Sequence, residues 1–425
     1  MMFDLIVKDA TLADGRTGMD VACRDGKVAA VERGITAEAG ARIDARGYLL
    51  SPPFVDPHFH MDATLSLGRP RMNRSGTLLE GIGLWGELKP IQSVEEIAER
   101  ALAYCELAIA RGIGAIRSHV DTCDDALKGV RALLDVREKV RDYIDLQLVA
   151  FPQDGLLRDP TAMVNTIRAL EMGVDVVGGI PHFERTMADG AESVRRSCEI
   201  AAERGLMVDL HCDESDDPLS RHIETLAFET QRLGLAGRVA GSHLTSMHSM
   251  DNYYVSKLIP LILEAGVHAI PNPAINIMLQ GRHDSYPRRR GLTRVRELRD
   301  AGITVGFGSD CMMDPWYSLG KADMLDIAFM GLHVGQLSSV EDMAWCFDAV
   351  TETSARILGL EGYGIAAGCD ANFVLLQAKD KIEAVRIRAH RLAVVRRGAV
   401  ISASDEITFD LRVLSGSALN EARLR

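Results

Sequence analysis

Several features that mark other protein classes are missing from this sequence of 425 residues. No apolar run approaches the ~18 residues that a membrane-spanning helix requires. The eight cysteines are scattered singly, without a CxxC pair, which argues against both a disulfide framework and a thiolate zinc site. Basic residues are outnumbered: 48 Lys and Arg stand against 60 Asp and Glu, for a net charge of -12. This argues against a nucleic-acid polymer as partner, because binding phosphates needs a basic surface.

The N-terminal segment also lacks the features of a signal peptide. Asp4 and Lys8 interrupt its apolar residues, and no small-residue cleavage site follows. We therefore expect a cytoplasmic protein without membrane attachment that acts on a small, neutral molecule. Hydrophobic side chains make up 47% of the residues, which is enough for a substantial core.

Short strands are predicted at both ends of the chain. Asp14-Gly15 and Asp25-Gly26 separate β-rich segments near the start, as expected for tight turns between strands. Near the other end, apolar β-type runs occupy residues 372–376, 392–395 and 399–401. We expect the two ends, residues 1–52 and 364–425, to combine into one small β-sandwich domain.

The middle of the chain repeats one pattern of strand and helix. Eight apolar, β-branched runs occupy residues 49–60, 115–121, 145–153, 174–182, 206–214, 238–245, 267–272 and 303–310. Segments with helical periodicity lie between most of them, such as residues 94–110 and 191–203. Glycines at 205, 266 and 302 stop helices just before the next strand. The alternation predicts an α/β fold with a parallel (β/α)8 TIM-type barrel over residues 53–363, whose chemistry lies at the C-terminal ends of the strands.

Histidines and one aspartate stand at those strand ends. His58 and His60 end the first predicted strand, His211 and His243 lie on the fifth and sixth, and Asp310 ends the eighth. Residues two apart in a strand point the same way, so His58 and His60 both face the barrel mouth. Imidazoles with a carboxylate suit zinc or iron and leave room for a bound water. Each residue alone is weak evidence, but their joint placement at converging strand ends predicts a site for a divalent metal ion.

Other polar residues near the strand ends receive structural interpretations. We expect His119 and His182 to be structural or to support the metal ligands. Asp213 and the aspartates that follow it are predicted to keep a loop solvated and to cap the next helix. Residues 182–184 match half of the signature of the nucleic-acid-editing zinc deaminases, but no P-C-x-x-C follows, which excludes that class.

Longer segments of the chain resemble a known family. Residues 55–60, Val-Asp-Pro-His-Phe-His, resemble the opening metal motif of the amidohydrolase superfamily, and residues 364–372 resemble its return into the small β-domain. Through most of its length the chain is more closely similar to the bacterial cytosine deaminases. The matching segments are Ser75-Gly76-Thr77-Leu78, Phe151-Pro152-Gln153, Ile180-Pro181-His182-Phe183-Glu184, His211-Cys212-Asp213-Glu214, Leu279-Gln280-Gly281-Arg282 and Asp314-Pro315-Trp316-Tyr317. These strings are long and unusual, so the match is specific.

The resemblance implies a mononuclear metal site and a set of catalytic groups. One divalent ion, Fe²⁺ or Zn²⁺, would be held by His58, His60, His211 and Asp310. Glu214 would exchange a proton with ring nitrogen N3, His243 would orient the attacking water, and Asp310 would take the proton of that water. Related enzymes with two metals commonly bridge them with a lysine on the fourth strand, and residues 178–180 offer none. The resemblance also implies a homo-oligomer.

The resemblance further implies how a pyrimidine base is bound. The amide of Gln153 would pair with the O2/N1 edge, while the backbone at Leu78 and the ring of Trp316 would shape the pocket. Where the bacterial cytosine deaminases have a second aspartate directly after the metal aspartate, this chain has Cys311. A hydrated carboxylate beside the C5 edge would oppose a methyl group there, whereas cysteine is smaller and less polar. We therefore hypothesise that 5-methylcytosine is used at least as well as cytosine.

The sequence thus predicts a metal-dependent hydrolytic deaminase of a cytosine-like base, which converts cytosine to uracil or 5-methylcytosine to thymine and releases ammonia. Gln153 and Glu214 together favour this over an isoguanine or triazine-type aminohydrolase on the same scaffold. The alternative from another class is a barrel that binds a metabolite without catalysis. Metal content and ammonia release distinguish these alternatives.

Overall fold

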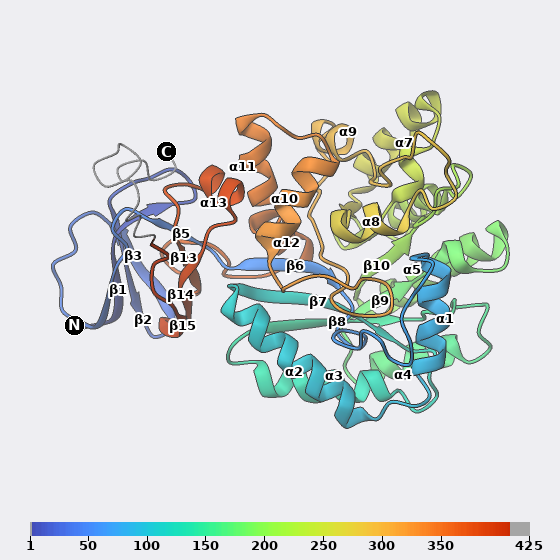
Figure 1. Ribbon diagram of the computed structural model, residues 1–425, viewed down its shortest axis with the longest axis horizontal. Coiled ribbons are helices and arrows are strands. Elements are labelled where there is room, and N and C mark those ends of the chain that lie inside the picture. Colours follow the sequence, from blue (N-terminus) through green and yellow to red (C-terminus); the bar gives the residue numbers. More distant parts are fainter. Residues whose placement is uncertain (1, 409–425) are drawn as a thin grey trace, which may run out of the picture.

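The computed structural model describes residues 2–408, whose strands form two sheets (Figure 1). The first sheet contains β1 (Phe3–Leu12), β2 (Met19–Arg24), β3 (Lys27–Glu32), β4 (Ala39–Asp44), β5 (Leu49–Ser51), β13 (Phe373–Leu376), β14 (Arg391–Arg396) and β15 (Ala399–Ala403). Its order is β15-β14-β13-β5-β1-β2-β3, with β4 paired to β1. The antiparallel pairing of β13 with β5 therefore joins the two ends of the chain, which confirms the predicted β-structure built from both.

A small hydrophobic core explains why these distant segments stay together. Leu5, Val21 and Leu50 from the N-terminal strands pack with Phe373 and Val395 from the C-terminal ones, and all are buried. Burying apolar side chains of this size contributes about 1.5–3 kcal/mol each. The exact domain limits remain a prediction, and residues 409–425 of the predicted β-domain lie outside the described part of the chain.

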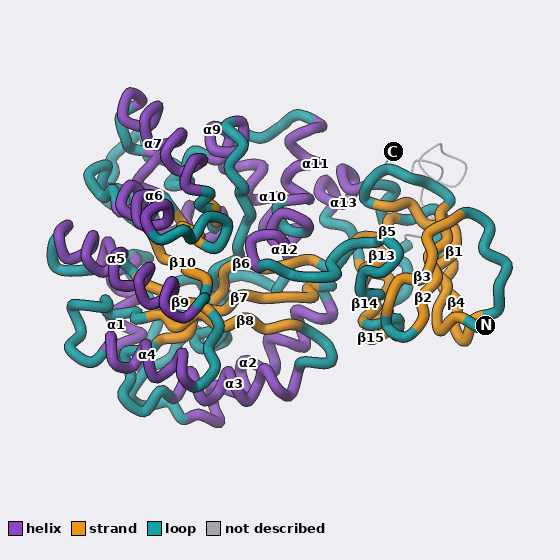
Figure 2. Tube along the Cα trace, turned by 180° about the vertical axis from the view of Figure 1, so that it is seen from behind, coloured by secondary structure: helices purple, strands orange, loops and turns teal. Residues whose placement is uncertain are grey.

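The second sheet is the barrel. Its parallel strands are β6 (Phe54–Phe59), β7 (Ile113–Asp121), β8 (Asp145–Phe151), β9 (Val176–Gly179), β10 (Met207–Cys212), β11 (Val239–His243) and β12 (His268–Ile270). They pair in sequence order from β6 to β12, and Figure 2 shows them at the centre of the larger lobe with helices around them. The single strand predicted over residues 49–60 is divided between β5 and β6, because Pro52 and Pro53 lack the N–H donors that a continuous ladder needs.

The predicted eighth strand takes a different form. Residues 303–310 close the barrel through two isolated parallel bridges, Ala269 to Val305 and Phe59 to Asp310. The Asp310 N–H donates to the carbonyl of His58 at 2.8 Å. The segment packs too closely for a regular strand of larger side chains, since a Cβ at Gly308 would lie 2.3 Å from Asn272 Oδ1. The position of this strand was predicted correctly, but its regular ladder was not.

Helices connect the barrel strands and cover their outer face (Figure 1). They are α1 (Leu78–Leu88), α2 (Val94–Ala110), α3 (Lys128–Val140), α4 (Ala162–Glu171), α5 (Met187–Arg204), α6 (His222–Arg232), α7 (Asn252–Ala265), α8 (Pro273–Leu279), α9 (Val295–Asp300), α10 (Met324–Val334), α11 (Val340–Asp348) and α12 (Glu352–Leu358), with short 3-10 helices η1 (Pro181–Phe183) and η2 (Thr245–His248). A further helix, α13 (Lys381–Ile387), connects β13 and β14 of the first sheet. The capping box of Ser93 and Glu96 starts α2 at the predicted residue. Gly205 and Gly266 end α5 and α7 in the left-handed conformation, as predicted.

A buried ion pair ties the first sheet to the barrel. Arg391 of β14 donates from Nη1 to Asp323 Oδ2 at 3.0 Å, and its Nε donates to the carbonyl of Arg111 at the end of α2. All eight cysteines are unpaired. No helix within residues 2–408 has both the length and the apolar character needed to cross a membrane.

Candidate active site

A narrow cavity lies at the C-terminal ends of the barrel strands. Its lining consists of His60, Leu78, Gln153, Ile180, His211, Glu214, Leu279, Asp310, Cys311 and Trp316. Eight of these are residues that the sequence predicted for the site; Ile180 and Leu279 are the additions. The free space of about 20 Å³ corresponds to roughly one water molecule. The two remaining predicted residues, His58 and His243, lie beneath this cavity and are fully buried.

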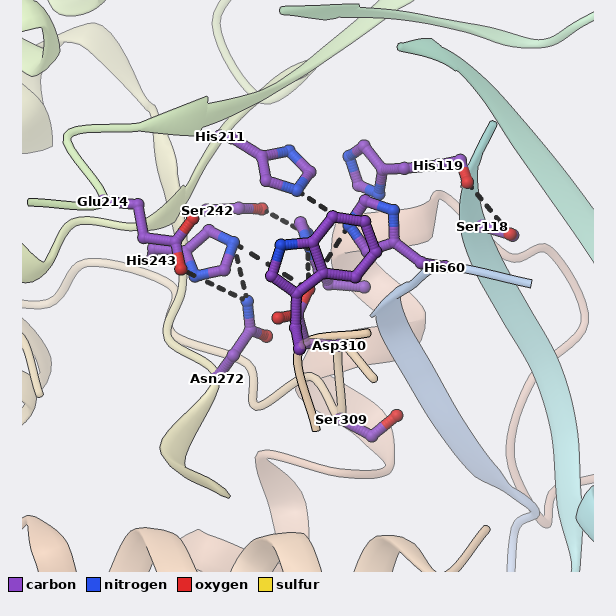
Figure 3. Close-up of polar contacts among 12 residues, drawn as sticks. His60, Ser118, His119, His211, Glu214, Ser242, His243, Asn272, Ser309 and Asp310 are labelled. Atoms are coloured by element: carbon purple, nitrogen blue, oxygen red, sulfur yellow. Dashed lines mark hydrogen bonds and ion pairs between the residues drawn. The ribbon is translucent and has the colours of Figure 1, made fainter. Parts of the chain in front are cut away.

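The predicted metal ligands converge beside the cavity (Figure 3). His60 Nε2 lies 2.8 Å from His211 Nε2. Asp310 Oδ1 lies 3.0 Å from His58 Nε2 and 3.4 Å from His60 Nε2. These ligand atoms belong to two overlapping groups of possible metal-binding residues, which share His58 and His211: one adds His60 and His119, and the other adds His243 and Asp310. Phe59, between the two histidines on β6, points the opposite way and stacks on Tyr104.

The chemistry of this donor set fits a divalent cation. Burial, followed by the charges of neighbouring histidines, lowers the pKa of His58 and of His211 well below the ordinary value, so both rings are neutral with lone pairs available. Burial acts to raise the pKa of Asp310, but His243, His58 and His60 outweigh it and hold that pKa well below normal. Asp310 Oδ1 is buried without a hydrogen bond. The neutral rings of His58 and His211 beside the ionised carboxylate leave lone pairs that a metal ion would satisfy. At His60 burial acts to lower the pKa, but Asp310 and the carboxylates of Asp62 and Asp314 outweigh it and raise that pKa.

Two of the site residues are held in a left-handed backbone conformation. His243 has φ 69° and Asp310 has φ 67°, in a region that side-chain-bearing residues rarely adopt. Each such residue costs of order 1–3 kcal/mol and persists only where the surrounding structure imposes it. Both residues end barrel segments, and their side chains lie in one group with His58 and His211.

His243 is fixed further by two asparagines. Asn276 Nδ2 donates to His243 Nδ1 at 2.9 Å, and Asn272 Nδ2 lies 3.3 Å from the same ring. Because burial lowers the pKa of His243 to about 4, the ring is neutral at pH 7. With Nδ1 accepting, Nε2 bears the proton, and this nitrogen lies 3.9 Å from Asp310 Oδ1. The sequence had offered Asn272 only as the last residue of a strand.

Glu214 has the environment of a proton carrier. Its side chain is 4% exposed, its Oε1 makes no hydrogen bond, and that atom lies 3.5 Å from His243 Nδ1. Burial, with a smaller contribution from the charge of Asp310, raises the pKa of Glu214 well above the usual range. A carboxyl group of this kind keeps its proton to higher pH than an ordinary glutamate and can donate it to a bound molecule.

The predictions for His182, His119 and Asp213 had different outcomes. His182 Nδ1 donates to the backbone carbonyl of His211 at 3.1 Å, consistent with its supporting role. His119 is fully buried within the cluster, and neither ring nitrogen has a hydrogen bond. The solvated loop predicted at Asp213 was wrong: this carboxylate is fully buried and accepts from Ser220 Oγ and from the first two N–H groups of α6. The helix-capping half of that prediction was correct.

Three buried polar residues were missed by the sequence analysis. Arg117 and Asp209 lie two residues before His119 and His211 on β7 and β10, and Ser242 directly precedes His243. Alternation along a strand places Arg117 and Asp209 on the same inward face as those histidines. Charged residues at positions where a barrel interior is normally apolar were the available signal.

Comparison with known proteins identifies relatives along nearly the whole chain. The model of the Amidohydrolase family matches residues 41–403. A 5-methylcytosine deaminase from Klebsiella pneumoniae, solved with 5-fluorocytosine, is 43% identical and superposes with a TM-score of 0.93, covering 96% of this chain and 99% of that one. An N-isopropylammelide isopropylaminohydrolase from Burkholderia multivorans is 25% identical, with a TM-score of 0.82 over 94% of this chain and 98% of that one.

A further relative also matches nearly the whole chain. The N-isopropylammelide isopropyl amidohydrolase of Pseudomonas sp. is 29% identical over 412 residues, which are 95% of this chain and 98% of the relative. The family match covers the whole barrel, the later strands of the first sheet and all of the candidate site, and it begins after β1, β2 and β3. The chain belongs to the amidohydrolase family.

Proposed function

We propose that this protein is a metal-dependent hydrolase that deaminates a cytosine-like base, converting cytosine to uracil and 5-methylcytosine to thymine with release of ammonia. The observation that supports this most directly is the cavity lined by Gln153, Glu214, Cys311 and Trp316 beside the histidine–aspartate cluster. The Klebsiella pneumoniae 5-methylcytosine deaminase shares 43% identity over 96% of the chain, which supports the same class of substrate.

The metal site of the proposal uses four side chains. One divalent ion, Fe²⁺ or Zn²⁺, would be held by His58, His60, His211 and Asp310. When bound, such an ion lowers the pKa of a coordinated water from 15.7 to about 7, which makes a nucleophile available at neutral pH. The imidazoles and the carboxylate suit either metal.

The proton carriers of the proposal are groups of this chain. The ionised carboxylate of Asp310 accepts the proton of the attacking water, and His243, with its proton on Nε2, directs that water toward C4 of the base. The protonated carboxyl of Glu214 donates to ring nitrogen N3 as C4 becomes tetrahedral. The Asp310 carboxyl, now protonated, supplies a proton to the departing amine. As the C4 carbonyl forms, the remaining proton of the C4 hydroxyl is released and restores the acid form of Glu214.

Recognition of the base is assigned to the cavity walls. Gln153 carries both a donor and an acceptor in its amide, which match the N1–H and O2 groups along one edge of cytosine. Leu78 and Trp316 supply the apolar faces on either side. Cys311 is 5% exposed and packs with Ile275 and Leu279. Its side chain adds no carboxylate to this edge of the cavity, where the buried Asp314 lies beside the thiol.

A second candidate function is an aminohydrolase acting on a triazine or on isoguanine. The relatives at 25–29% identity favour it, because they are hydrolases of N-isopropylammelide, which is a triazine. The higher identity to the pyrimidine deaminase favours the first candidate. The presence of both Gln153 and Glu214 in the cavity lining favours it as well.

The test is a panel of cytosine, 5-methylcytosine, isoguanine and N-isopropylammelide, assayed for ammonia release before and after metal removal. We expect the two pyrimidines to be preferred, about one divalent ion per chain by elemental analysis, and loss of both metal and activity in His211→Ala. Preference for isoguanine or the triazine would replace the first candidate with the second. Two tightly bound ions per chain, or full activity after exhaustive chelation, would contradict the mononuclear site.

We also propose that the protein is a cytoplasmic homo-oligomer with a composite domain of residues 1–52 and 364–425 beside the barrel of residues 53–363. The eight unpaired cysteines support a reducing compartment. The pairing of β5 with β13 supports the composite domain. Sedimentation analysis measures the oligomeric state.

A further inference from the structure

A chain of buried polar groups runs beneath the histidine cluster, through the interior of the barrel. His58 Nδ1 lies 2.9 Å from Ser242 Oγ. Ser242 Oγ donates to Asp209 Oδ1 at 2.6 Å, and Arg117 Nη1 donates to Asp209 Oδ2 at 3.0 Å. All four side chains are at most 1% exposed. Ser242 appears in Figure 3 beside the cluster of rings.

The direction of each hydrogen bond in this chain is determined by proton counting. A carboxylate paired with a guanidinium is ionised and can only accept hydrogen bonds. The single hydroxyl proton of Ser242 must therefore point at Asp209. Ser242 Oγ is then left with lone pairs toward His58, so His58 Nδ1 must carry a proton and donate it. The neutral ring consequently has its lone pair on Nε2, the nitrogen that faces Asp310 Oδ1 at 3.0 Å.

Arg117 is held firmly enough to impose this arrangement. Its Nε donates to Gln147 Oε1 at 2.7 Å and its Nη2 donates to the carbonyl of Ile357 at 3.2 Å. Taking an ion pair out of water costs several kcal/mol per ion, and well-packed apolar residues are often at least as stable. A barrel interior is ordinarily filled by branched apolar residues. An arginine and an aspartate here therefore call for an explanation other than stability.

We propose that Asp209 and Ser242 are positioning residues that lock His58 in the tautomer able to bind a metal through Nε2, and that Arg117 keeps Asp209 an acceptor. The inference rests on the proposed metal site and adds the groups that prepare one of its ligands. These residues touch neither substrate nor metal; they act through the ring of His58.

The first test removes the acceptor for His58. In Ser242→Ala, Nδ1 loses its partner and the two tautomers become comparably populated. We expect the dissociation constant of Zn²⁺, measured by competition with a chromogenic chelator, to rise by roughly 10–100-fold, the usual effect of losing a partner that orients a metal ligand. The matched control is Ser197→Ala, which deletes a buried hydroxyl that donates to the Gly178 carbonyl; its metal affinity should not change.

The second test reverses the hydrogen-bond direction without changing shape. In Asp209→Asn, Arg117 still needs an acceptor, so the amide oxygen faces the guanidinium and the amide nitrogen faces Ser242. The hydroxyl must then donate to His58 Nδ1, which favours the proton on Nε2 and opposes metal binding. We expect a loss of Zn²⁺ affinity as large as in Ser242→Ala. The control is Asp342→Asn. It alters a buried carboxylate of α11 that is paired with Arg299 of α9, away from the barrel interior, and its Zn²⁺ affinity should not change.

The outcomes separate the two proposals. Failure of the unmodified protein to bind a divalent ion would refute the proposed function itself. If the unmodified protein binds Zn²⁺ tightly and either Ser242→Ala or Asp209→Asn binds it within twofold of that affinity, the positioning role is wrong. The KM for the base in metal-saturated variants should stay near the unmodified value, because none of these residues lines the cavity.

Discussion

At the scale of a single residue, Glu214 provides the sharpest test of the proposed chemistry. Glu214→Gln keeps the shape and the metal ligands but removes the transferable proton, so kcat should fall by roughly 10²-fold or more while metal content is unchanged. Because burial raises the pKa of Glu214 well above its usual range, the required acid form persists to higher pH than in an ordinary glutamate. It is lost as the pH rises through that raised pKa.

The unmodified enzyme should therefore lose kcat at high pH, and the residual activity of Glu214→Gln should lack this alkaline limb. Ammonia release measured across pH in both proteins checks the expectation. Near-normal turnover by the glutamine variant would show that another group supplies the proton.

Cys311 determines selectivity at one edge of the cavity in our proposal. Cys311→Asp places a carboxylate against Ile275 and Leu279, and its hydration opposes a methyl group at C5. Burying one methylene-sized group is worth about 0.8 kcal/mol, so kcat/KM should shift from 5-methylcytosine toward cytosine by roughly fourfold or more. Cys311→Ser is the control, since it keeps the size and the neutral charge. Strong discrimination against 5-methylcytosine by the unmodified protein would end this hypothesis and leave the deaminase assignment intact.

At the scale of one element, α6 depends on a carboxylate from outside the helix. Asp213 accepts from the backbone N–H groups of His222 and Ile223, and from His222 Nδ1 at 2.8 Å. Asp213→Asn removes the charge that complements the helix N-terminus and leaves a donor where an acceptor is needed. We expect a loss of about 1–3 kcal/mol in the free energy of unfolding, measured by thermal and urea denaturation.

Asp217 provides the comparison for that change. It is exposed and accepts only from the Leu219 N–H, so Asp217→Asn should stay within about 0.5 kcal/mol of the unmodified protein. Equal stability of the two variants would mean that the buried carboxylate contributes no more than the exposed one.

Elements with their own local signals were predicted well, whereas elements shaped by their neighbours were not. The helix predicted over residues 94–110 coincides with α2, because its capping box and apolar periodicity are local. The strand predicted over residues 303–310 failed as a regular strand, because the close approach of Gly308 to Asn272 is set by tertiary packing. Asp213 was misjudged for a related reason: aspartate in a loop is usually solvated, and only the fold buries this one.

At the scale of the whole molecule, barrel topology is what made the site predictable. Strand ends converge in a parallel barrel, so His58, His60, His211, His243 and Asp310 could be grouped from the sequence alone. The resemblance to the cytosine deaminases then implied which four of them hold the metal. The same rule does not specify which inward residue of one strand faces which residue of the next. Asp209 and Ser242 therefore escaped notice, since their meeting depends on the register of β10 against β11.

The closure of the barrel by residues 303–310 also affects where the structure opens locally. This segment is joined to β12 and β6 by isolated bridges instead of a continuous ladder, and weakly bonded segments open most readily. We call the junction of this segment with β6 the seam. Asp310 lies on the segment, opposite His58 on β6, so an ion held by both residues would link the two sides of the seam. An ion present at 100 times its dissociation constant stabilises by about 2.7 kcal/mol the form that binds it.

Metal removal should accordingly speed hydrogen–deuterium exchange of the amides at residues 303–310 by up to about 100-fold, while amides in the ladder between β7 and β8 stay slow. Unchanged exchange along the seam would mean that the barrel closes without help from the ion. When the ion is bound, opening of the seam is coupled to release of the metal. A metal-starved cell would then hold a protein that is both inactive and easier for proteases to cut at this segment.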